Sequence, residues 1–348
     1  MKGLMRAALW VALLGGLVAA RGAVAAEIRF LTWADYIAPE VIEAFERQTG
    51  HRIVLDTIDN YSDLKARFLA DPKRYDLINP ADYHVAEFAR KGLLARVDAA
   101  RLPGYANILD GWRSPPYDPR NEWSVPFHWG TTSLVVDTAV YGGPADSYSL
   151  LFDPPPELKD KVGFMIGAEE TLRMALIHQG LPPCTSDPAV LRKAAALVRP
   201  LMHKDRIYSI STVTEVLAGD AVAVGVAWNG DALKAREAKP SLRYVFPKEG
   251  LLIWSDALAV PRGAKNKEAA IAFMDFLLQP QAAAAQTNYT RYANTVRGSD
   301  AFMDQSLLEA PEVVLPTDAP VRFFRSCDSE QLGLYSDIWD PILKEAAR

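Results

Sequence analysis

The chain has 348 residues, of which 49% are apolar and 23% are charged, and its formal net charge is -5 at pH 7. A chain of this length can form two units, each with its own hydrophobic core. The mild acidity argues against nucleic acid as a partner and favours a cationic small molecule.

Residues 1–25 have the pattern of a cleaved export signal. Two basic residues, Lys2 and Arg6, precede an apolar run at 7–20, and Ala23-Val24-Ala25 has the small-x-small pattern that signal peptidase cleaves. The apolar run is too short for a membrane span, and Arg21 follows it at once. We therefore expect cleavage near Ala25 and an exported mature protein.

Two cysteines, Cys184 and Cys327, lie far apart in the sequence. After export they would meet an oxidising compartment, and either a single disulfide or two buried thiols would be compatible with this spacing. The five histidines are scattered, and no Cys/His spacing suggests a metal site. We expect the protein to need no metal and no cofactor.

Strands and helices alternate along residues 27–94. Apolar segments at 27–32, 52–57 and 75–79 predict strands, and the segments that follow them predict helices at 39–48, 64–69 and 85–91. This order predicts right-handed crossovers and a parallel sheet, in which ligands bind at the carboxyl ends of the strands. Two segments in that position, Trp33-Ala34-Asp35-Tyr36 and Pro80-Ala81-Asp82-Tyr83, each combine aromatic residues with an acid.

Two later strands also bring a tryptophan and an aspartate together. The stretch 251–261 carries Trp254 and Asp256 near its middle, and a strand at 222–228 ends in Trp228 shortly before Asp231. An unpaired buried carboxylate is costly, so Asp256 either has a partner inside the protein or faces a cleft where a cationic ligand supplies one. Because an indole face also attracts an ammonium group, the two strands predict the walls of one cation-binding pocket.

Further helices are predicted where apolar residues recur on one face of the segment. They cover residues 169–178, 188–202, 213–217, 231–238, 266–278 and 336–346, with a short helix at 302–308 and a strand at 162–166.

Seven segments occur in a specific order along nearly the whole mature chain. They are FLTWADYIAPEVIEAFERQTG, YDLINPADY, GAEETLRMAL, VAVGVAWNGD, YVFPKEG, IWSDALAVPRGAKNKEAAIAFMDFLLQP and RYANT. Together they resemble the periplasmic polyamine-binding proteins of ABC importers, the spermidine and putrescine receptors. The resemblance implies an α/β protein with the type II periplasmic-binding-protein fold, in which two lobes with mixed and parallel sheets close about a hinge over the ligand.

The resemblance also implies how the chain is divided and with what it acts. Lobe 1 would comprise residues 27–134 and about 257–305, and lobe 2 residues 135–256 and about 306–348. The crossings would lie near Val135-Val136, near 256–258 and between 297 and 320. A monomeric periplasmic protein of this kind would deliver its amine to permease subunits in the inner membrane.

Carried over to this sequence, the family's site consists of aromatic rings around the methylene groups of the amine and acids that pair with its ammonium groups. These residues are Trp33, Asp35, Tyr36, Tyr83, Glu170, Trp228, Asp231, Trp254, Asp256 and Tyr292. Glu170 and Asp35 could instead stabilise the starts of nearby helices. Ala34, Ala81 and Gly167 lack polar groups found in family members, so the resemblance leaves the particular polyamine open.

Two other functions are compatible with these residues. Arg291 directly precedes Tyr292 and could receive the carboxylate of a smaller amine or amino-acid-like zwitterion. Paired carboxylates among aromatic rings would also suit a carboxylate-dependent hydrolase. However, the sequence has no nucleophile elbow, P-loop or dinucleotide-binding glycine motif. We therefore expect a binding protein, serving either an importer or a membrane sensor, rather than an enzyme.

Overall fold

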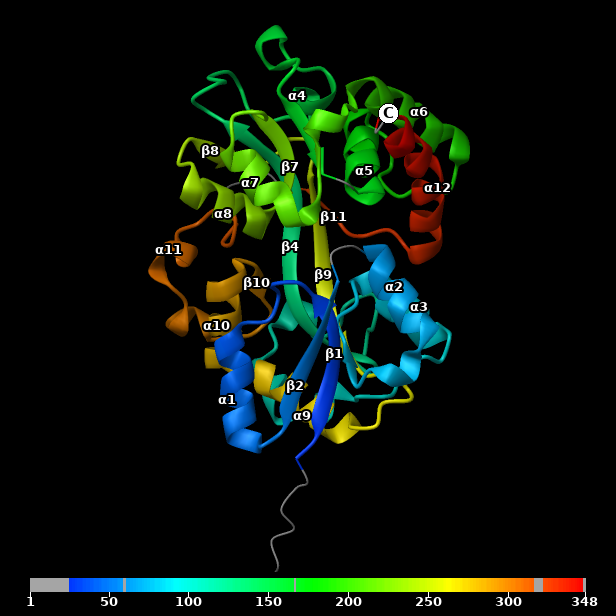
Figure 1. Ribbon diagram of the computed structural model, residues 1–348, viewed down its shortest axis with the longest axis vertical. Coiled ribbons are helices and arrows are strands. Elements are labelled where there is room, and N and C mark those ends of the chain that lie inside the picture. Colours follow the sequence, from blue (N-terminus) through cyan, green and yellow to red (C-terminus); the bar gives the residue numbers. More distant parts are fainter. Residues whose placement is uncertain (1–24, 59–60, 166, 316–321, 347–348) are drawn as a thin grey trace, which may run out of the picture.

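The computed structural model describes residues 25–58, 61–165, 167–315 and 322–346, and the predicted export signal at 1–25 lies outside them except for Ala25. Two long strands, β4 (Ser124–Asp137) and β9 (Leu251–Ala259), run through the middle of the molecule and connect a lower and an upper lobe (Figure 1). No helix in the described part of the chain is long and apolar enough to cross a membrane.

The lower lobe contains the strand and helix alternation that the sequence predicts. β1 pairs in parallel with β2 and β3, and Ile78 of β3 pairs antiparallel with Ala259 of β9. The strands are β1 (Glu27–Trp33), β2 (Arg52–Ile58) and β3 (Leu77–Ile78), and the helices are α1 (Pro39–Thr49), α2 (Tyr61–Ala70), α3 (Asp82–Arg90), α9 (Lys267–Leu277) and α10 (Pro280–Thr290).

Helix α1 illustrates how local sequence positions the loop that precedes it. Pro39 suits the first turn, and Gly50 ends the helix in the left-handed region with φ 74°. Val41 and Phe45 are buried one turn apart, which anchors the helix against the sheet. The backbone N–H of Ala38 donates to the side chain of Gln286 in α10, so the end of the loop that leads into α1 is fixed to α10.

The upper lobe is built on a mixed sheet. β7 and β8 pair antiparallel with β4, while β5 runs parallel to β7 and β6 runs parallel to β5. The strands are β5 (Val162–Met165), β6 (Ile207–Tyr208), β7 (Val224–Trp228) and β8 (Leu242–Tyr244), and the helices are α4 (Ser149–Phe152), α5 (Ala168–His178), α6 (Pro188–Val198), α7 (Val213–Ala218), α8 (Asn229–Ala238) and α12 (Ser329–Ala346).

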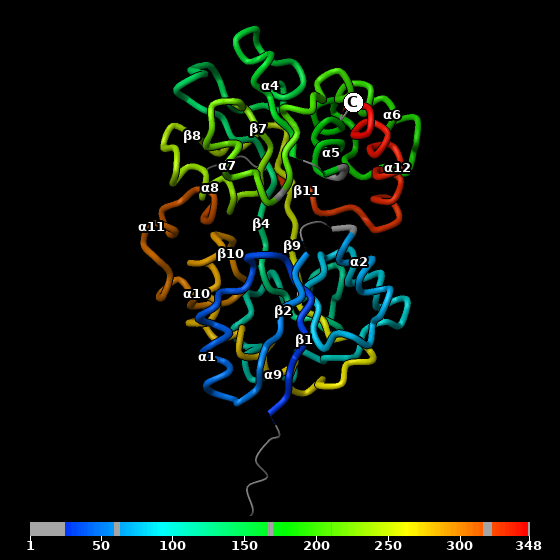
Figure 2. Tube along the Cα trace, viewed as in Figure 1, coloured from blue at the N-terminus to red at the C-terminus, as the bar shows by residue number. Residues whose placement is uncertain are grey.

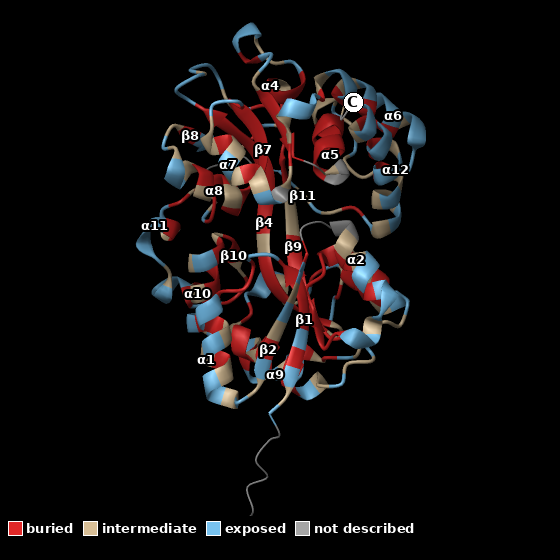
Figure 3. Ribbon diagram, viewed as in Figure 1, coloured by how far each residue is buried: buried red, intermediate tan, exposed pale blue. Residues whose placement is uncertain are grey.

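The β4–β9 pairing changes register between the lobes. Ser124 to Pro126 pair with Ala259 to Ala257, and Trp129 to Thr132 pair with Ser255 to Leu252, with an irregularity between Pro126 and Trp129. Val135 and Val136, near which we expected a crossing, already pair with β7 and β8. Buried residues dominate the central strands that continue through both lobes (Figure 3).

A third connection runs along the side of the molecule. After β10 (Ala293–Asn294), which pairs with β4, the chain passes through α11 (Gln305–Leu308) into the upper lobe (Figure 2). There β11 (Phe323–Phe324) pairs in parallel with Leu251 and Leu252 of β9. The short helix expected at 302–308 corresponds to a 3₁₀ turn at Ser299–Phe302 followed by α11.

Some helix limits differ from the predictions for clear physical reasons. The helix predicted at 188–202 ends as an α-helix at Val198 and continues as a 3₁₀ turn, because Pro200 has no N–H to donate. Helix α10 was not predicted, since its apolar residues are mainly alanines that form no one-sided pattern. Helix α12 begins at Ser329 instead of 336, and Asp328 accepts hydrogen bonds from its first turn.

The two cysteines form a disulfide, which resolves the two alternatives left by the sequence. Cys184 and Cys327 are bonded across a sequence separation of 143 residues, with their Cα atoms 5.3 Å apart. The bond joins the loop after α5 to the segment just before α12. Arg173 of α5 also donates hydrogen bonds to the carbonyls of Phe324 and Arg325, so the same segment is fixed twice.

We predict that the double variant Cys184→Ser/Cys327→Ser is less stable by about 2–4 kcal/mol in urea unfolding, because the long loop is no longer closed in the unfolded chain. A reductant should lower the stability of the wild-type protein to a similar value and leave the variant unchanged. Wild-type stability that does not respond to the reductant would contradict this prediction.

Candidate functional site

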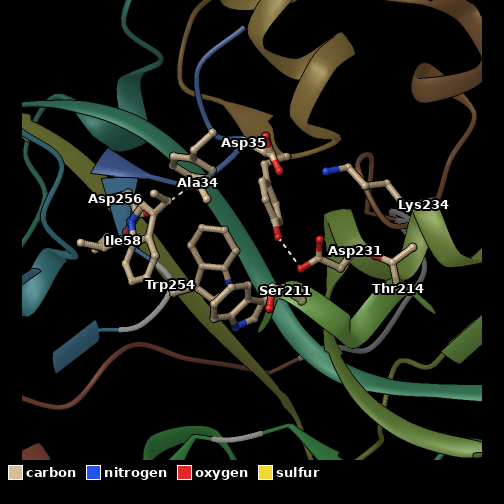
Figure 4. Close-up of a pocket in the computed structure, with 13 residues that line it drawn as sticks. Ala34, Asp35, Ile58, Ser211, Thr214, Asp231, Lys234, Trp254 and Asp256 are labelled. Carbon is tan, nitrogen blue, oxygen red and sulfur yellow. Dashed lines mark hydrogen bonds between the residues drawn. The ribbon is translucent and has the colours of Figure 1, made fainter. Parts of the chain in front are cut away.

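One cavity between the lobes collects most of the residues predicted for the site. It has a volume of about 220 Å³ and draws its walls from both lobes (Figure 4). Eight predicted residues line it: Trp33, Asp35, Tyr36, Trp228, Asp231, Trp254, Asp256 and Tyr292. Five further lining residues were not predicted as site residues: Ala34, Ile58, Ser211, Thr214 and Lys234.

The lower wall forms at the carboxyl ends of β1 and β2. Trp33 ends β1 and Ile58 ends β2, and the N–H of Ala34 donates to the Ile58 carbonyl at 3.0 Å. Asp35 then adopts the left-handed region with φ 52°, a conformation that aspartate tolerates better than most residues. This turn brings Tyr36 under the cavity, as the strand-end rule for parallel sheets predicts.

The sequence left two alternatives open for Asp256, a partner inside the protein or a position facing a cleft, and both apply. It has a protein partner, because the Tyr36 hydroxyl donates to its Oδ2 at 2.7 Å, and it also lines the cavity. Burial raises the pKa of Asp256 to about 7, partly opposed by the hydrogen bond from Tyr36 and assisted by the charge of Asp82. A cation placed beside this carboxyl group would favour its ionised form.

Asp231 repeats this arrangement in the upper lobe. It lies in the first turn of α8, directly after β7, and accepts a 2.9 Å hydrogen bond from the hydroxyl of Tyr292. Burial raises the pKa of Asp231, while the charge of Lys234 and the bond from Tyr292 oppose that shift. A Cβ atom at position 230 would lie 2.6 Å from the Tyr292 ring, so Gly230 allows the close approach.

Aromatic rings connect the two carboxyl groups. The ring centroids of Tyr36 and Tyr292 are 5.7 Å apart, those of Tyr292 and Trp254 5.2 Å, and those of Trp254 and Trp228 6.1 Å. Two of these three contacts are edge-to-face, a favourable geometry for aromatic pairs. A Cβ at position 130 would collide with Trp254, so Gly130 of β4 leaves room for this indole.

Tyr83 and Glu170 do not line this cavity. They border a separate space of about 10 Å³, together with Arg173 and Ser326, and Trp254 lies between the two spaces because it lines both. Glu170 is buried, which raises its pKa, and it accepts a 3.3 Å hydrogen bond from the indole N–H of Trp228. The hydrogen bond from Trp228 to Glu170 therefore helps to fix the indole of Trp228, which lines the cavity.

Arg291 is also outside the lining. It ends α10 in the left-handed region with φ 69°, and its guanidinium forms a 3.1 Å ion pair with Glu237 of α8. The role that the sequence suggested for Arg291, binding a ligand carboxylate, thus has no support in the geometry. Among the described residues that line the cavity, the basic one is Lys234.

Two lobes joined by shared strands, with a cavity lined from both, define the type II fold of periplasmic binding proteins. Residues 40–312 match the model of the bacterial extracellular solute-binding protein family, and the chain belongs to that family. It is 31% identical to the spermidine/putrescine-binding periplasmic protein of Escherichia coli K12, over 73% of each chain. It is 29% identical to the putrescine-binding periplasmic protein PotF of the same strain, over 87% of this chain and 88% of the relative.

Solved structures agree on the fold. A spermidine/putrescine transporter structure from Listeria monocytogenes superimposes with a TM-score of 0.85 at 23% identity, covering 92% of this chain and 99% of the other. The spermidine/putrescine ABC transporter substrate-binding protein of Streptococcus pneumoniae gives a TM-score of 0.77 at 24% identity, covering 93% and 100%. Since the related proteins are solute-binding proteins, this chain is a binding protein and not an enzyme.

The pKa of Asp256 predicts how stability depends on pH. The folded protein holds this proton more tightly than the unfolded chain, so the group favours folding below pH 4, and this contribution is lost as the pH rises from about 4 to about 7. Asp256→Asn should therefore gain stability relative to the wild type over that interval, by about 1.4 kcal/mol for each unit of pKa difference.

Urea unfolding at several pH values measures this difference. Asp160→Asn, which changes an exposed aspartate, is the matched control and should show a constant difference from the wild type. The prediction is wrong if the Asp256→Asn difference is equally independent of pH.

Proposed function

We propose that this protein is the substrate-binding component of an ABC importer and binds one linear di- or polyamine in the cavity between its lobes. The observation that carries the proposal is the pair of carboxyl groups of Asp256, which is buried, and Asp231, which is half-buried, each bonded to a tyrosine hydroxyl in one aromatic cavity. Related proteins named for spermidine and putrescine binding support the same ligand class.

The charges of the cavity suit a ligand with separated ammonium groups. Burial raises the pKa of both Asp231 and Asp256, because their carboxylates have lost hydration. A ligand cation beside each carboxylate would stabilise its ionised form. A charged hydrogen bond contributes about 1.5–3 kcal/mol, and an ammonium over an aromatic face adds roughly 0.5–2 kcal/mol. The acids would therefore provide most of the affinity, with the rings enclosing the methylene groups.

The position of the cavity supports binding by closure of the lobes. We propose that the hinge lies at residues 127–130 of β4 and 255–256 of β9, where the register of the two strands changes. Lobe 1 would then comprise 27–126 and 257–305, and lobe 2 the segments 131–254 and 306–348. Tyr292 and Asp231 belong to different lobes in this division, so their hydrogen bond would form on closure.

The proposed cellular setting follows from the family. An export signal at residues 1–25, cleaved near Ala25, would place the mature protein in the periplasm, where the named relatives are found. The closed pair of lobes would present the amine to permease subunits in the inner membrane. We further propose that the protein acts as a monomer with one site per chain.

Titration calorimetry with putrescine, cadaverine, spermidine and spermine tests the ligand class. We expect one binding event per chain for at least one of these amines. Asp256→Asn and Asp231→Asn should each weaken that event by about 2–5 kcal/mol, because a charge partner in the cavity is lost. Absence of heat with all four amines, in protein shown to be folded, would contradict the proposed function.

Arg291→Ala separates amine binding from zwitterion binding. Arg291 is outside the cavity lining, and its ion pair with Glu237 is partly exposed, so the variant should bind the amine within about fivefold of the wild type. Glu237→Gln removes the other half of the ion pair and should have an equally small effect. Complete loss of binding in Arg291→Ala alone would favour a ligand that carries a carboxylate.

A further inference from the structure

Lys234 brings a positive charge into a cavity that otherwise suits cations. It lies on α8 three residues after Asp231, so both side chains are on the same face of the helix, and both line the cavity. In Figure 4 the ammonium end of Lys234 extends toward Asp35, which comes from the other lobe and also lines the cavity. Nothing in the sequence patterns or in the proposed amine binding accounts for this lysine.

The charged residues of the lining divide into two groups. Asp256 is buried and Asp231 is half-buried, and they accept hydrogen bonds from Tyr36 and Tyr292. The described lining contains three aspartates and one lysine, Lys234, whose charge acts on Asp231 and whose ammonium end extends toward Asp35 (Figure 4). Two carboxyl groups therefore remain to be matched by ligand charge.

Building on the proposed function, we propose that Lys234 is a specificity-determining residue that restricts the cavity to diamines and discriminates against triamines and tetraamines. The two ammonium groups of a diamine pair with Asp256 and Asp231. A third ammonium group would have to extend past Asp231, where it meets the ammonium of Lys234. Its remaining acidic partner is Asp35, for which it competes with Lys234.

This arrangement makes a specific prediction for Lys234→Gln, which keeps much of the side-chain length and removes its charge. The affinity for spermidine should rise about tenfold, equivalent to about 1.4 kcal/mol, while the affinity for putrescine changes far less. Lys234→Arg keeps the charge and should keep the preference for putrescine. Lys248→Gln, an exposed lysine outside the cavity, is the matched control and should leave both affinities unchanged.

A double variant tests the path of the third ammonium group. If Lys234→Gln frees Asp35 for that group, then adding Asp35→Asn should remove most of the gain for spermidine. Calorimetry gives the affinities, and thermal melts without amine confirm that each variant is folded. A general loosening of the cavity by Lys234→Gln would instead survive the Asp35→Asn change and would contradict the role of Lys234.

Other outcomes separate this inference from the proposed function. Putrescine binding with a spermidine-to-putrescine affinity ratio that is the same in wild type and Lys234→Gln would overturn the inference and leave amine binding intact. Tighter wild-type binding of 4-aminobutyrate than of putrescine would also overturn it, because Lys234 would then receive a carboxylate. If no amine binds to the wild type, the proposed function and this inference both fail.

Discussion

The carboxyl group of Asp256 is buried on a strand that both lobes share, and the hydroxyl of Tyr36 donates a hydrogen bond to it. A buried carboxyl group loses its hydration, and one neutral donor does not replace that loss in full. This loss of hydration is the main reason why the pKa of Asp256 is raised. Because Asp231 is held in the same way by Tyr292, the cavity has two places where a cation relieves an electrostatic cost.

The fold around this constraint is arranged to keep both acids in position. β9 carries Trp254 and Asp256 to the place where the lobes meet, and β7 leads into α8, which carries Asp231. Asn229 stabilises that start of the helix, since its Oδ1 accepts from the N–H of Thr131 and its Nδ2 donates to the Glu312 carbonyl. The site thereby takes one acid, Asp231, from the upper lobe and the other, Asp256, from a strand that both lobes share.

Several parts of the site could be predicted from the sequence because they depend on local rules. Trp33 and Tyr36 follow the end of a parallel strand, and Trp228 precedes the helix that presents Asp231. Lys234 could have been found by the same reasoning, since it lies three residues beyond Asp231 on one helix face. The family resemblance correctly indicated the fold and the class of protein.

Other parts depend on contacts between distant segments and have no local signal. Ser211 and Thr214 reach the cavity from the segment that leads into α7, where no strand-end pattern marks them. Tyr83 follows β3 as the strand-end rule requires, yet it borders the smaller space, because Trp254 stands between the two. The disulfide also lay beyond local reasoning, since its cysteines meet only through the packing of α5 and α12.

The return of the C-terminal segment to the upper lobe has a consequence for the order of folding. β11 pairs with β9, α12 packs against α5 and α6, and the disulfide joins Cys327 to Cys184. The upper lobe therefore cannot complete its core until residues far along the chain have arrived, whereas β1, β2 and β3 pair soon after one another. Contacts between segments so distant in sequence carry a large loop-closure entropy and slow folding.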